Sequence, residues 1–401
     1  MAKRKIQKPT RFERMYKVWD YLRKNTDRRH PTSIAKMRKD ENINAYIGDK
    51  ETINRLLKDM ANIMNLEDGG SDYKPEAEWR LYFDDFKKFY GDKERYERDD
   101  SDEDDSYIAN VMRIKNLYYN RTFSEKEVDS IIEGIMATRT LDSKSAQELV
   151  RKVEDNMTTV FYKRTPRHIC KVQEPELADR ELLKDNLAII QKAIDDNVRI
   201  QFRFNGYSYE KKLEPVMEES DELSPYYIVA SGGKYYLLAA KEYEDYKPDM
   251  SIWRIDLMTD IEIPGRNDRL HIKGIPRIPK KNVSNLPEKW SEDFQLKHLN
   301  MSFDKPVPVT LRIKSEKCED NPKKRVRPGY TFLHDWFGDS FTYIRTEKEP
   351  PYDDIVRVEC SPYGMAHWAL QYSELVEILE PESLREDIKS KIKALNEKYS
   401  L

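Results

Sequence analysis

This sequence of 401 residues lacks long apolar runs and closely spaced cysteines. No run approaches the ~18 consecutive apolar residues of an ordinary transmembrane helix. No apolar stretch follows the basic residues 3–5, so we expect neither a membrane span nor a secretory signal. The cysteines Cys170, Cys318 and Cys360 lie too far apart for a disulfide framework or a CxxC metal site. A reducing cytoplasm is the expected compartment, and no cofactor is expected.

Familiar catalytic motifs are missing as well. The sequence has no GxSxG elbow, no GxxxxGK[ST] loop and no HExxH pair. Gly232-Gly233-Lys234 lacks the spacing of a phosphate-binding loop and is predicted to be a hairpin turn. The six histidines are scattered, and His334-Asp335 is the only adjacent pair of a histidine and an acid. We therefore do not expect an enzyme.

Charge is abundant but unevenly placed. Charged residues make up 36% of the chain, against a usual ~25%, and the net charge is only −3. Residues 1–60 hold 17 Lys and Arg against 8 Asp and Glu, a net of +9, whereas the remaining 341 residues hold 54 against 66, a net of −12. A basic head on an acidic body indicates a nucleic-acid contact at one end, although a merely solvated basic helix face gives the same count.

The basic head has the pattern of a winged helix-turn-helix over residues 1–90. Apolar spacing predicts helices near residues 11–24, 31–37 and 49–60. A hairpin tip is predicted at residues 67–70. In such a domain the third helix offers a polar face to the major groove of duplex DNA. A three-helix protein-interaction module is the alternative.

The residues expected to contact DNA fall into two sets. The polar face of the third helix offers candidates for base and phosphate contacts, namely Lys50, Thr52, Asn54, Arg55 and Lys58. The loop and second helix before it offer further phosphate contacts, namely Arg28, Arg29, Thr32 and Ser33, with a basic arm at Lys3, Arg4, Lys5 and Lys8.

An acidic linker and helical spacer are predicted over residues 91–180. The acidic run at residues 97–105 lacks the Gly and Glu positions of an EF-hand loop, so a solvated linker is expected rather than a metal site. Three helices are predicted here. The first covers about residues 107–119, the second begins after the capping box of Ser124 and Glu127, and the third ends at Met157. This bundle is interpreted as a spacer or a dimerisation element.

Strand-like alternation begins after a helix predicted at residues 181–195. Residues 199–204 form a predicted strand, Asn205-Gly206 its turn and residues 207–213 the return strand. A second hairpin is expected at residues 226–239 and a fifth strand at 252–256. Five closely spaced strands favour a small, strongly bent antiparallel barrel over residues 181–264.

The last third of the chain is predicted to hold a connection and a further domain. Residues 265–305 are Pro-rich and irregular. Strands near residues 307–313, 341–345, 355–360 and 376–379 alternate with helices near 365–372 and 381–399. This pattern predicts an α/β sandwich over residues 306–401, which makes the whole chain a multidomain α+β protein.

Several short motifs occur in the order typical of one family. They are Leu213-Glu214-Pro215, Tyr235-Tyr236-Leu237, Trp253-Arg254-Ile255-Asp256, Trp336-Phe337-Gly338-Asp339, the Trp-containing helix at residues 364–372 and Pro381-Glu382-Ser383-Leu384-Arg385. The chain resembles the WYL-domain transcription regulators of bacteria over nearly its whole length. The resemblance implies a winged helix, a helical spacer, a small Sm-like WYL barrel and a C-terminal WYL extension domain.

The family also implies a ligand pocket on the barrel, lined by basic and aromatic residues. Cations that neutralise phosphates beside rings that stack bases suit a nucleotide or a single-stranded nucleic acid. The matching residues are Arg203, Lys211, Lys212, Tyr226, Lys234, Tyr235 and Arg254. Packing of these rings in a small core is the alternative, and Tyr236 and Trp253 are expected in the core. Leu257 and Ser251 replace arginines of the family.

Two functions remain open at this point. The first is a ligand-responsive transcription regulator that binds operator DNA as a homodimer. The second, implied by relatives that assist defence systems, is an accessory protein of a phage-defence or CRISPR system that binds RNA or a protein effector and modulates it.

Overall fold

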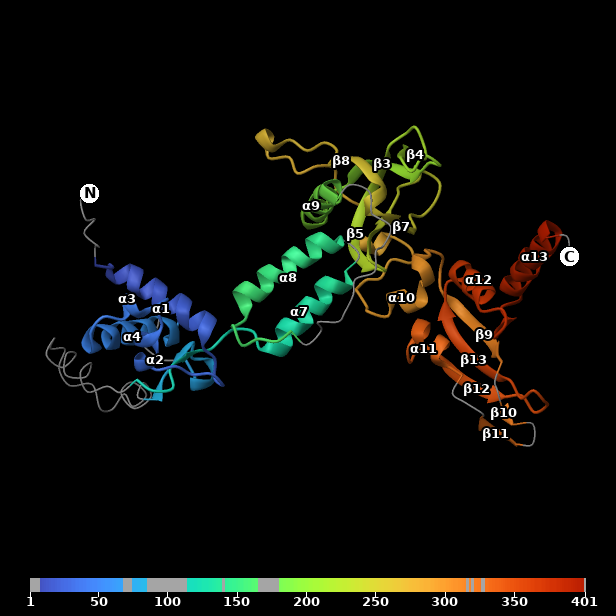
Figure 1. Cartoon of the computed structure of the whole chain (residues 1–401). Coiled ribbons are helices and arrows are strands. Elements are labelled where there is room, and N and C mark those ends of the chain that lie inside the picture. Colours follow the sequence, from blue (N-terminus) through green and yellow to red (C-terminus); the bar gives the residue numbers. More distant parts are fainter. Residues whose placement is uncertain are drawn as a thin grey trace. The chain divides into compact units, whose positions relative to one another are not determined.

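The computed structural model describes residues 8–67, 74–84, 114–138, 141–164, 180–314, 317–318, 321–325 and 329–399. The chain divides into two compact units, unit 1 at residues 1–175 and unit 2 at residues 176–401 (Figure 1). Within the described ranges, no helix is long and apolar enough to cross a membrane. The acidic run at 97–105 and the basic residues 3–5 lie outside the described residues.

Four helices open unit 1, namely α1 (Arg11–Asn25), α2 (Ile34–Lys39), α3 (Asn44–Ile47) and α4 (Lys50–Asn65). A capping box of Thr10 and Glu13 begins α1, and the side chain of Asp49 caps α4. The apolar faces of α1 and α4 meet in one core, where Leu22 and Leu57 are fully buried. The predicted helices near 11–24 and 49–60 are therefore confirmed.

A small antiparallel strand pair follows α4. β1 (Leu81–Tyr82) pairs with β2 (Tyr118–Tyr119), and Thr32 forms a bridge with Leu117 beside it. The buried Asn65 at the end of α4 donates to the main-chain oxygen of Leu81 at 2.8 Å, and its Oδ1 accepts from the main-chain N–H groups of Arg80 and Leu81. These three hydrogen bonds fix β1 to α4.

One prediction about this region is wrong, and another is not tested. The tip of the hairpin expected at residues 67–70 lies largely outside the described residues, which resume at residue 74. The helix expected at residues 107–119 is absent from its described part, since residues 118–119 are strand β2. Residues 107–113 lie outside the described part of the chain.

Two further helices lie in the described part of unit 1, namely α7 (Glu125–Ala137) and α8 (Ser143–Met157). The predicted capping box of Ser124 and Glu127 begins α7, and Val128, Ile132 and Val150 form the core between the helices. Hydrogen bonds join this pair to α1. Arg23 Nη1 donates to the main-chain oxygen of Asn156 at 2.9 Å, and the N–H of Val160 donates to the oxygen of Lys24 at 3.0 Å.

Unit 2 begins with α9 (Arg180–Asp196) and a curled antiparallel sheet. Its strands are β3 (Ile200–Tyr207), β4 (Leu213–Pro215), β5 (Asp221–Ser231), β6 (Lys234–Ala240), β7 (Met250–Arg254) and β8 (Met258–Glu262). The order is β4-β3-β5-β6-β7, with β8 paired to β3. β7 and β8 do not pair with each other within residues 180–314, so the expected small, strongly bent barrel is a half-barrel.

The turn predicted at Asn205-Gly206 is wrong. Both residues lie inside β3, and the chain turns at Ser208 and Lys212, whose main chains are hydrogen-bonded. Asn205 is buried and its Nδ2 donates to the oxygen of Leu257 at 3.0 Å, a tertiary bond that holds it in the strand. The hairpin at Gly232-Gly233 is confirmed, and both glycines have positive φ.

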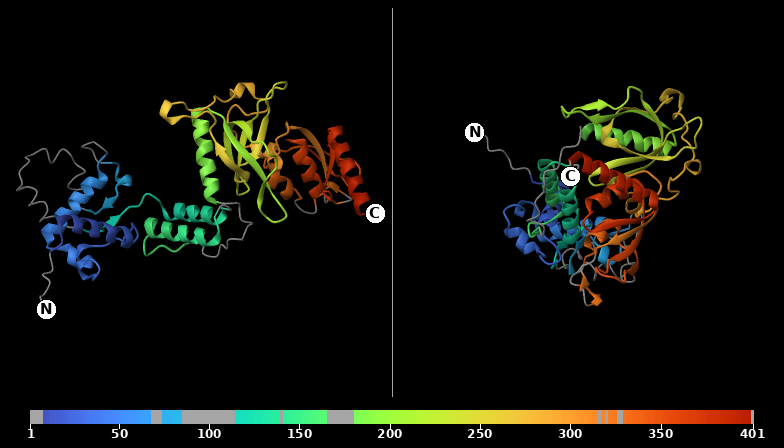
Figure 2. Two further views of the ribbon diagram at one scale, coloured as in Figure 1. Left: turned by 90° about the horizontal axis from the view of Figure 1, so that it is seen from above. Right: turned by 90° about the vertical axis from the view of Figure 1, so that its right-hand side faces the viewer.

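The curled sheet packs on both of its faces. On one face Phe202, Leu237 and Ile190 of α9 share a core, and α9 runs along the sheet (Figure 2). On the other face Leu238 and Met250 pack against residues of the Pro-rich connection. These include Phe294 in α10 (Phe294–Lys297) and Met301 at the end of the turn η6 (Leu299–Met301).

The last part of unit 2 has a four-stranded antiparallel sheet of order β12-β13-β9-β14. These strands are Thr342–Thr346, Asp354–Cys360, Val307–Ile313 and Val376–Glu380 in that order. The helices α11 (Thr331–Phe337), α12 (Pro362–Gln371) and α13 (Glu382–Tyr399) contribute to its core, and β10 (Lys317–Cys318) pairs with β11 (Asn321–Arg325). The strands and helices predicted here are confirmed.

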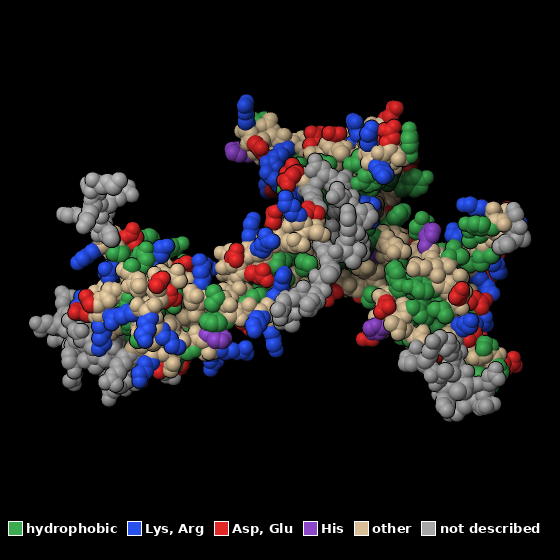
Figure 3. All heavy atoms as spheres, in the orientation of Figure 1, with side chains coloured by type: hydrophobic (Ala, Val, Ile, Leu, Met, Phe, Trp, Pro, Cys, Tyr) green, Lys and Arg blue, Asp and Glu red, His purple; other side chains and the backbone are tan. Residues whose placement is uncertain are grey.

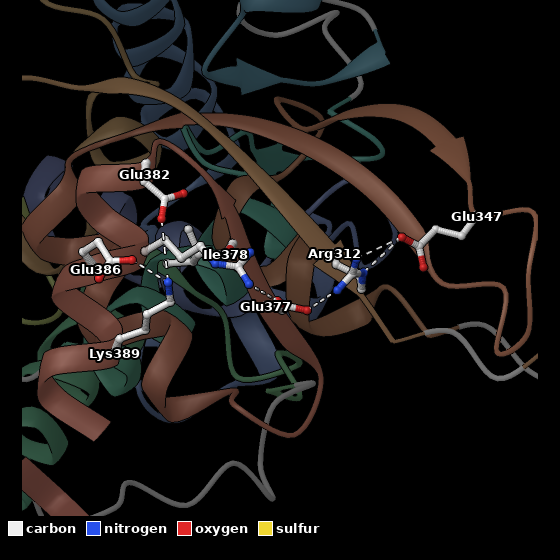
Figure 4. A network of polar contacts seen from close by, with 8 residues as sticks. Arg312, Glu347, Glu377, Ile378, Glu382, Glu386 and Lys389 are labelled. Carbon is white, nitrogen blue, oxygen red and sulfur yellow. Dashed lines mark hydrogen bonds and ion pairs between the residues drawn. The ribbon is translucent and has the colours of Figure 1, made fainter. Parts of the chain in front are cut away.

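A chain of ion pairs ties two of these strands, β9 and β14, to α13 (Figure 4). Arg312 on β9 pairs with Glu347 at 3.1 Å and with Glu377 on β14. Arg385 of α13 pairs with the same Glu377 at 2.9 Å and donates to the main-chain oxygen of Ile378. The shared carboxylate therefore links the sheet to the last helix.

Candidate nucleic-acid interface and effector site

The N-terminal end of α4 gathers positive charge from three helices. Arg38 of α2 donates from Nη2 to the main-chain oxygen of Gly48 at 3.2 Å. Arg14 of α1 lies so close that a Cβ at Gly48 would be 2.5 Å from its Nη1. The hydrogen bond from the main-chain N–H of Thr52 holds the pKa of Asp49 below its ordinary value, and Arg14 and Arg38 add to this effect.

Four of the expected DNA contacts on α4 lie at or near its surface. Lys50 and Arg55 are exposed, and Thr52 and Lys58 are half-buried. Arg55 pairs with Glu51 one turn earlier at 2.8 Å, and both side chains are about half exposed. Such an exposed ion pair contributes little stability. An anion can therefore replace Glu51 as the partner of Arg55 with little loss of free energy. Figure 3 shows Lys and Arg side chains gathered on the visible face of this part.

Asn54 is the exception, and its predicted exposure is wrong. Its side chain is fully buried among Ile53, Leu57 and the rest of the α1–α4 core. The prediction rested on the polarity of the side chain. The position of Asn54 along α4, however, directs that side chain toward the core. Asn54 therefore does not belong to the exposed face of α4.

The loop before α2 supplies the other set. Arg28 and Arg29 are exposed, and their side chains form no ion pair with a described residue. Ser33 caps α2 by accepting from the N–H of Lys36 at 3.3 Å. Thr32 is largely buried, and its main chain bonds Leu117. Of these four, the two arginines are the residues placed to meet an anion.

Arg254 is the best-placed cation on the curled sheet. Its Nε and Nη2 donate to the carboxylate of the buried Asp256 at 3.1 and 2.6 Å, while Nη1 has no hydrogen-bond partner among the described residues. Burial alone lowers the pKa of Arg254, but the hydrogen bonds and charge of Asp256 outweigh burial and raise it. The guanidinium is therefore charged and fixed in position by Asp256, and the side chain of Arg254 is 29% exposed.

The two tyrosines of the Tyr235-Tyr236 motif face opposite sides of the sheet. Tyr236 lies directly opposite Arg254 in the β6–β7 register, and burial raises its pKa. Tyr235 packs instead against the core shared with α9, on the same side as Trp253, whose ring meets Phe202 edge-on at 5.6 Å. The structure thus places Tyr236, and not Tyr235, beside the cation.

The remaining expected effector residues are dispersed. Tyr226 is 2% exposed and its hydroxyl donates to the main-chain oxygen of Ile278 at 2.7 Å, so its expected availability to a ligand is wrong. Lys211 and Lys212 lie on the exposed turn after β3, where Lys212 pairs with Glu210. Lys234 begins β6, half-buried.

Arg203 lies on β3 opposite Thr259, 4.0 Å from a carboxylate oxygen of Asp260. Its side chain is 44% exposed, although its Nε is buried and has no hydrogen-bond partner among the described residues. It alternates with Phe202 and Phe204, whose rings meet Trp253. Arg203 therefore points to the sheet face opposite these rings.

Three residues near these sites escaped the sequence analysis. They are Arg14, Arg38 and the exposed Tyr207, which acts electrostatically on Arg254. The only signal in the sequence was Gly48, a residue suited to the positive φ that the chain adopts before α4. No group of His, Cys, Asp and Glu within the described ranges is arranged to hold a metal ion.

Comparison with known proteins gives one family model and several solved structures, of which two are described. A search of curated proteins found no match. The chain is similar to proteasome accessory factor B/C (PafBC) of Arthrobacter aurescens, with 15% identity, 87% of this chain and 55% of that chain covered, and a TM-score of 0.22. It is also similar to a CRISPR Cas-related protein, with 14% identity, 76% of each chain covered and a TM-score of 0.30. It spans about half the length of PafBC.

The family match lies in the last part of unit 2. Residues 305–395 match the model of the WCX domain, the C-terminal extension of WYL-domain proteins. They cover the four-stranded sheet and nearly all of α13. A curled antiparallel half-barrel precedes this domain, and helices open the chain. The chain therefore carries a WCX domain at residues 305–395.

Proposed function

We propose that the chain is a DNA-binding transcriptional regulator that acts as a homodimer. In this proposal α4 enters the major groove and the basic loop before α2 contacts the DNA backbone. The half-barrel, which we assign as the Sm-like WYL domain, binds a nucleotide-like or single-stranded nucleic-acid effector. Such an effector acts by favouring one of two states of the protein.

The observation that carries the DNA part is the placement of cations around one end of α4. Arg14, Arg38 and Lys50 surround its first turn, where the helix dipole also favours anions. Arg28 and Arg29 add two exposed guanidiniums without ion pairs in the described structure. Contacts of this kind neutralise DNA phosphates, while Arg55 has the fork geometry that reads guanine.

The test is fluorescence anisotropy with a labelled 30-base-pair duplex over a salt series. Arg28→Ala/Arg29→Ala should lower affinity about tenfold or more and reduce the salt slope by about two, roughly one per lost phosphate contact. Arg151→Ala, on an exposed arginine of α8, is the matched control and should behave as the wild type. Equal affinities for all three proteins would contradict the proposal.

The effector part rests on Arg254, which is fixed by Asp256 beside Tyr236. A labelled single-stranded oligonucleotide should bind the full chain, and Arg254→Gln should weaken this binding while duplex binding is kept. Equal loss of both would overturn the two-site arrangement. A preference of the wild type for single strands without sequence choice, and no site-specific duplex band, would favour the accessory protein of a defence system.

A further inference from the structure

A cavity of about 460 Å³ lies within unit 1, where the end of α1, strand β2 and the helix pair α7–α8 meet. Residues 27–29, 119–125 and 157–159 supply most of its lining. The volume falls in the usual range of small-molecule sites, ~300–1,000 Å³. The cavity is separate from the curled sheet, which belongs to unit 2.

Arg121 in the wall of this cavity is an incompletely bonded cation. Its Nη1 donates to the main-chain oxygen of Thr26 at 3.1 Å. Its Nε and Nη2 are buried and have no hydrogen-bond partner among the described residues. Burial lowers the pKa of Arg121, and the charge of Asp27 offsets this only in part. Buried charges are normally paired and hydrogen-bonded, so this guanidinium lacks an acceptor.

The carboxylates of the lining cannot all serve as that acceptor. Asp27 already accepts from the main-chain N–H groups of Arg29 and His30, at 2.7 and 2.8 Å. Glu127 accepts from the N–H and the hydroxyl of Ser124, both at 2.8 Å. These oxygens are engaged, whereas the guanidiniums of Arg28 and Arg29 form no ion pair in the described structure. Glu125, the third carboxylate of the lining, is exposed and accepts no hydrogen bond from a described residue. Three incompletely bonded guanidiniums therefore share the cavity with one available carboxylate.

Part of the wall is apolar. Phe123, Val128 and Met157 line it, so the occupant needs a body that can lie against carbon atoms as well as an anionic group. Phosphate suits guanidinium groups, because several of its oxygens accept hydrogen bonds from the planar fork.

We propose that this cavity binds a small phosphate-bearing ligand of about the size of a mononucleotide. The phosphate accepts from Arg28, Arg29 and, after a small rotation of its side chain, Arg121, while the body of the ligand packs on Phe123 and Met157. The ligand touches the winged-helix part and the α7–α8 pair at once. If Arg28 and Arg29 also contact DNA, a point that rests on the proposed function, ligand and duplex compete for them.

The binding test is calorimetric titration of the full chain with inorganic phosphate, pyrophosphate and AMP at low salt. AMP should bind more tightly than phosphate, because only AMP fills the apolar part. Arg121→Gln should weaken AMP binding tenfold or more. Arg28→Gln/Arg29→Gln should also weaken it tenfold or more, and this variant leaves the core unchanged because both residues are exposed. Arg151→Gln is the matched control and should leave binding unchanged.

Three outcomes would overturn the proposal. The first is that none of the three probes binds the wild-type chain. The second is that AMP binding is lost in Arg254→Gln but kept in the Arg28→Gln/Arg29→Gln variant, which would assign it to the sheet. The third is that Arg121→Gln, in a folded protein, binds AMP as tightly as the wild type does. None of these readouts uses DNA, so failure here is distinct from failure of the proposed function.

Discussion

Arg254 and Asp256 form a two-point contact at the end of β7, with Nε and Nη2 of the arginine each donating to one carboxylate oxygen. The carboxylate is 1% exposed and the guanidinium 29% exposed. The pair thus fixes the direction of a charged group at the surface from a support buried beneath it. Its geometry accounts for the Arg-x-Asp spacing in the sequence, since the two residues are separated only by Ile255.

Replacing the buried support should weaken the protein. Asp256→Asn removes a charge from beneath Arg254 and leaves a guanidinium N–H without its acceptor, which should lower the free energy of unfolding by about 1–3 kcal/mol. Urea unfolding of the full chain is the measurement. Glu210→Gln, which breaks the exposed pair with Lys212, should change it by less than ~0.5 kcal/mol. A similar loss of unfolding free energy in both variants would show that the burial of Asp256 does not add to the stability of the protein.

Asn65 should be needed to hold the strand pair. Asn65→Leu leaves the main-chain groups of Arg80 and Leu81 without their partners, at a destabilisation of about 1–3 kcal/mol. Hydrogen exchange of the peptide covering residues 79–84 should become faster. Ile63→Ala, on an exposed residue of the same helix, is the control. Unchanged protection of that peptide in Asn65→Leu would contradict the role given to Asn65.

Cys360 should be unreactive in the native protein. The thiol is fully buried, and burial raises its pKa to about 12. Because the thiolate is the reactive form, alkylation by N-ethylmaleimide at pH 7.5 should be at least ~1,000-fold slower than for an ordinary thiol. A Cys170→Ser/Cys318→Ser variant leaves Cys360 as the only cysteine, and guanidinium should restore labelling. Rapid labelling before unfolding would refute the burial.

Unit 1 should lose part of its stability in acid through Asp27. Burial alone would raise the pKa of Asp27, but hydrogen bonds from His30 and Arg29 outweigh burial and lower it. Because the pKa of Asp27 is lower in the folded protein, its carboxylate stabilises the fold at pH values above its unfolded pKa of ~3.9. This stabilisation is lost as the pH falls below that value. Asp27→Asn should therefore lower Tm at pH 6, and its difference in Tm from the wild type should shrink as the pH is lowered through the folded pKa of Asp27. Asp155→Asn, on an exposed residue of α8, should change neither.

The sequence predicted elements whose signals are local. The capping box of Ser124 and Glu127, the glycine pair at 232–233 and the alternating strands of the WCX domain all appear as expected. Each depends on residues within a few positions of one another. Periodicity and turn chemistry therefore sufficed for these parts of the fold.

The failures concern residues whose place is decided by distant partners. Asn205-Gly206 has the composition of a turn, but Asn205 bonds Leu257, 52 positions later, and stays in β3. Tyr226 has a polar tip, yet that tip reaches Ile278 and the ring is buried. Neither partner could be known from the local sequence, because the pairing arises only when the sheet curls.

The joint between α1 and the helices that follow β2 relies on main-chain oxygens as acceptors. Arg23 bonds the carbonyl of Asn156, Arg121 that of Thr26, and the N–H of Val160 that of Lys24. A carbonyl is present whatever side chain a residue carries. Asn156 and Lys24 can therefore vary without loss of these bonds. Arg23 and Arg121, one on each side of the joint, cannot be replaced by most residues, because their side chains are the donors.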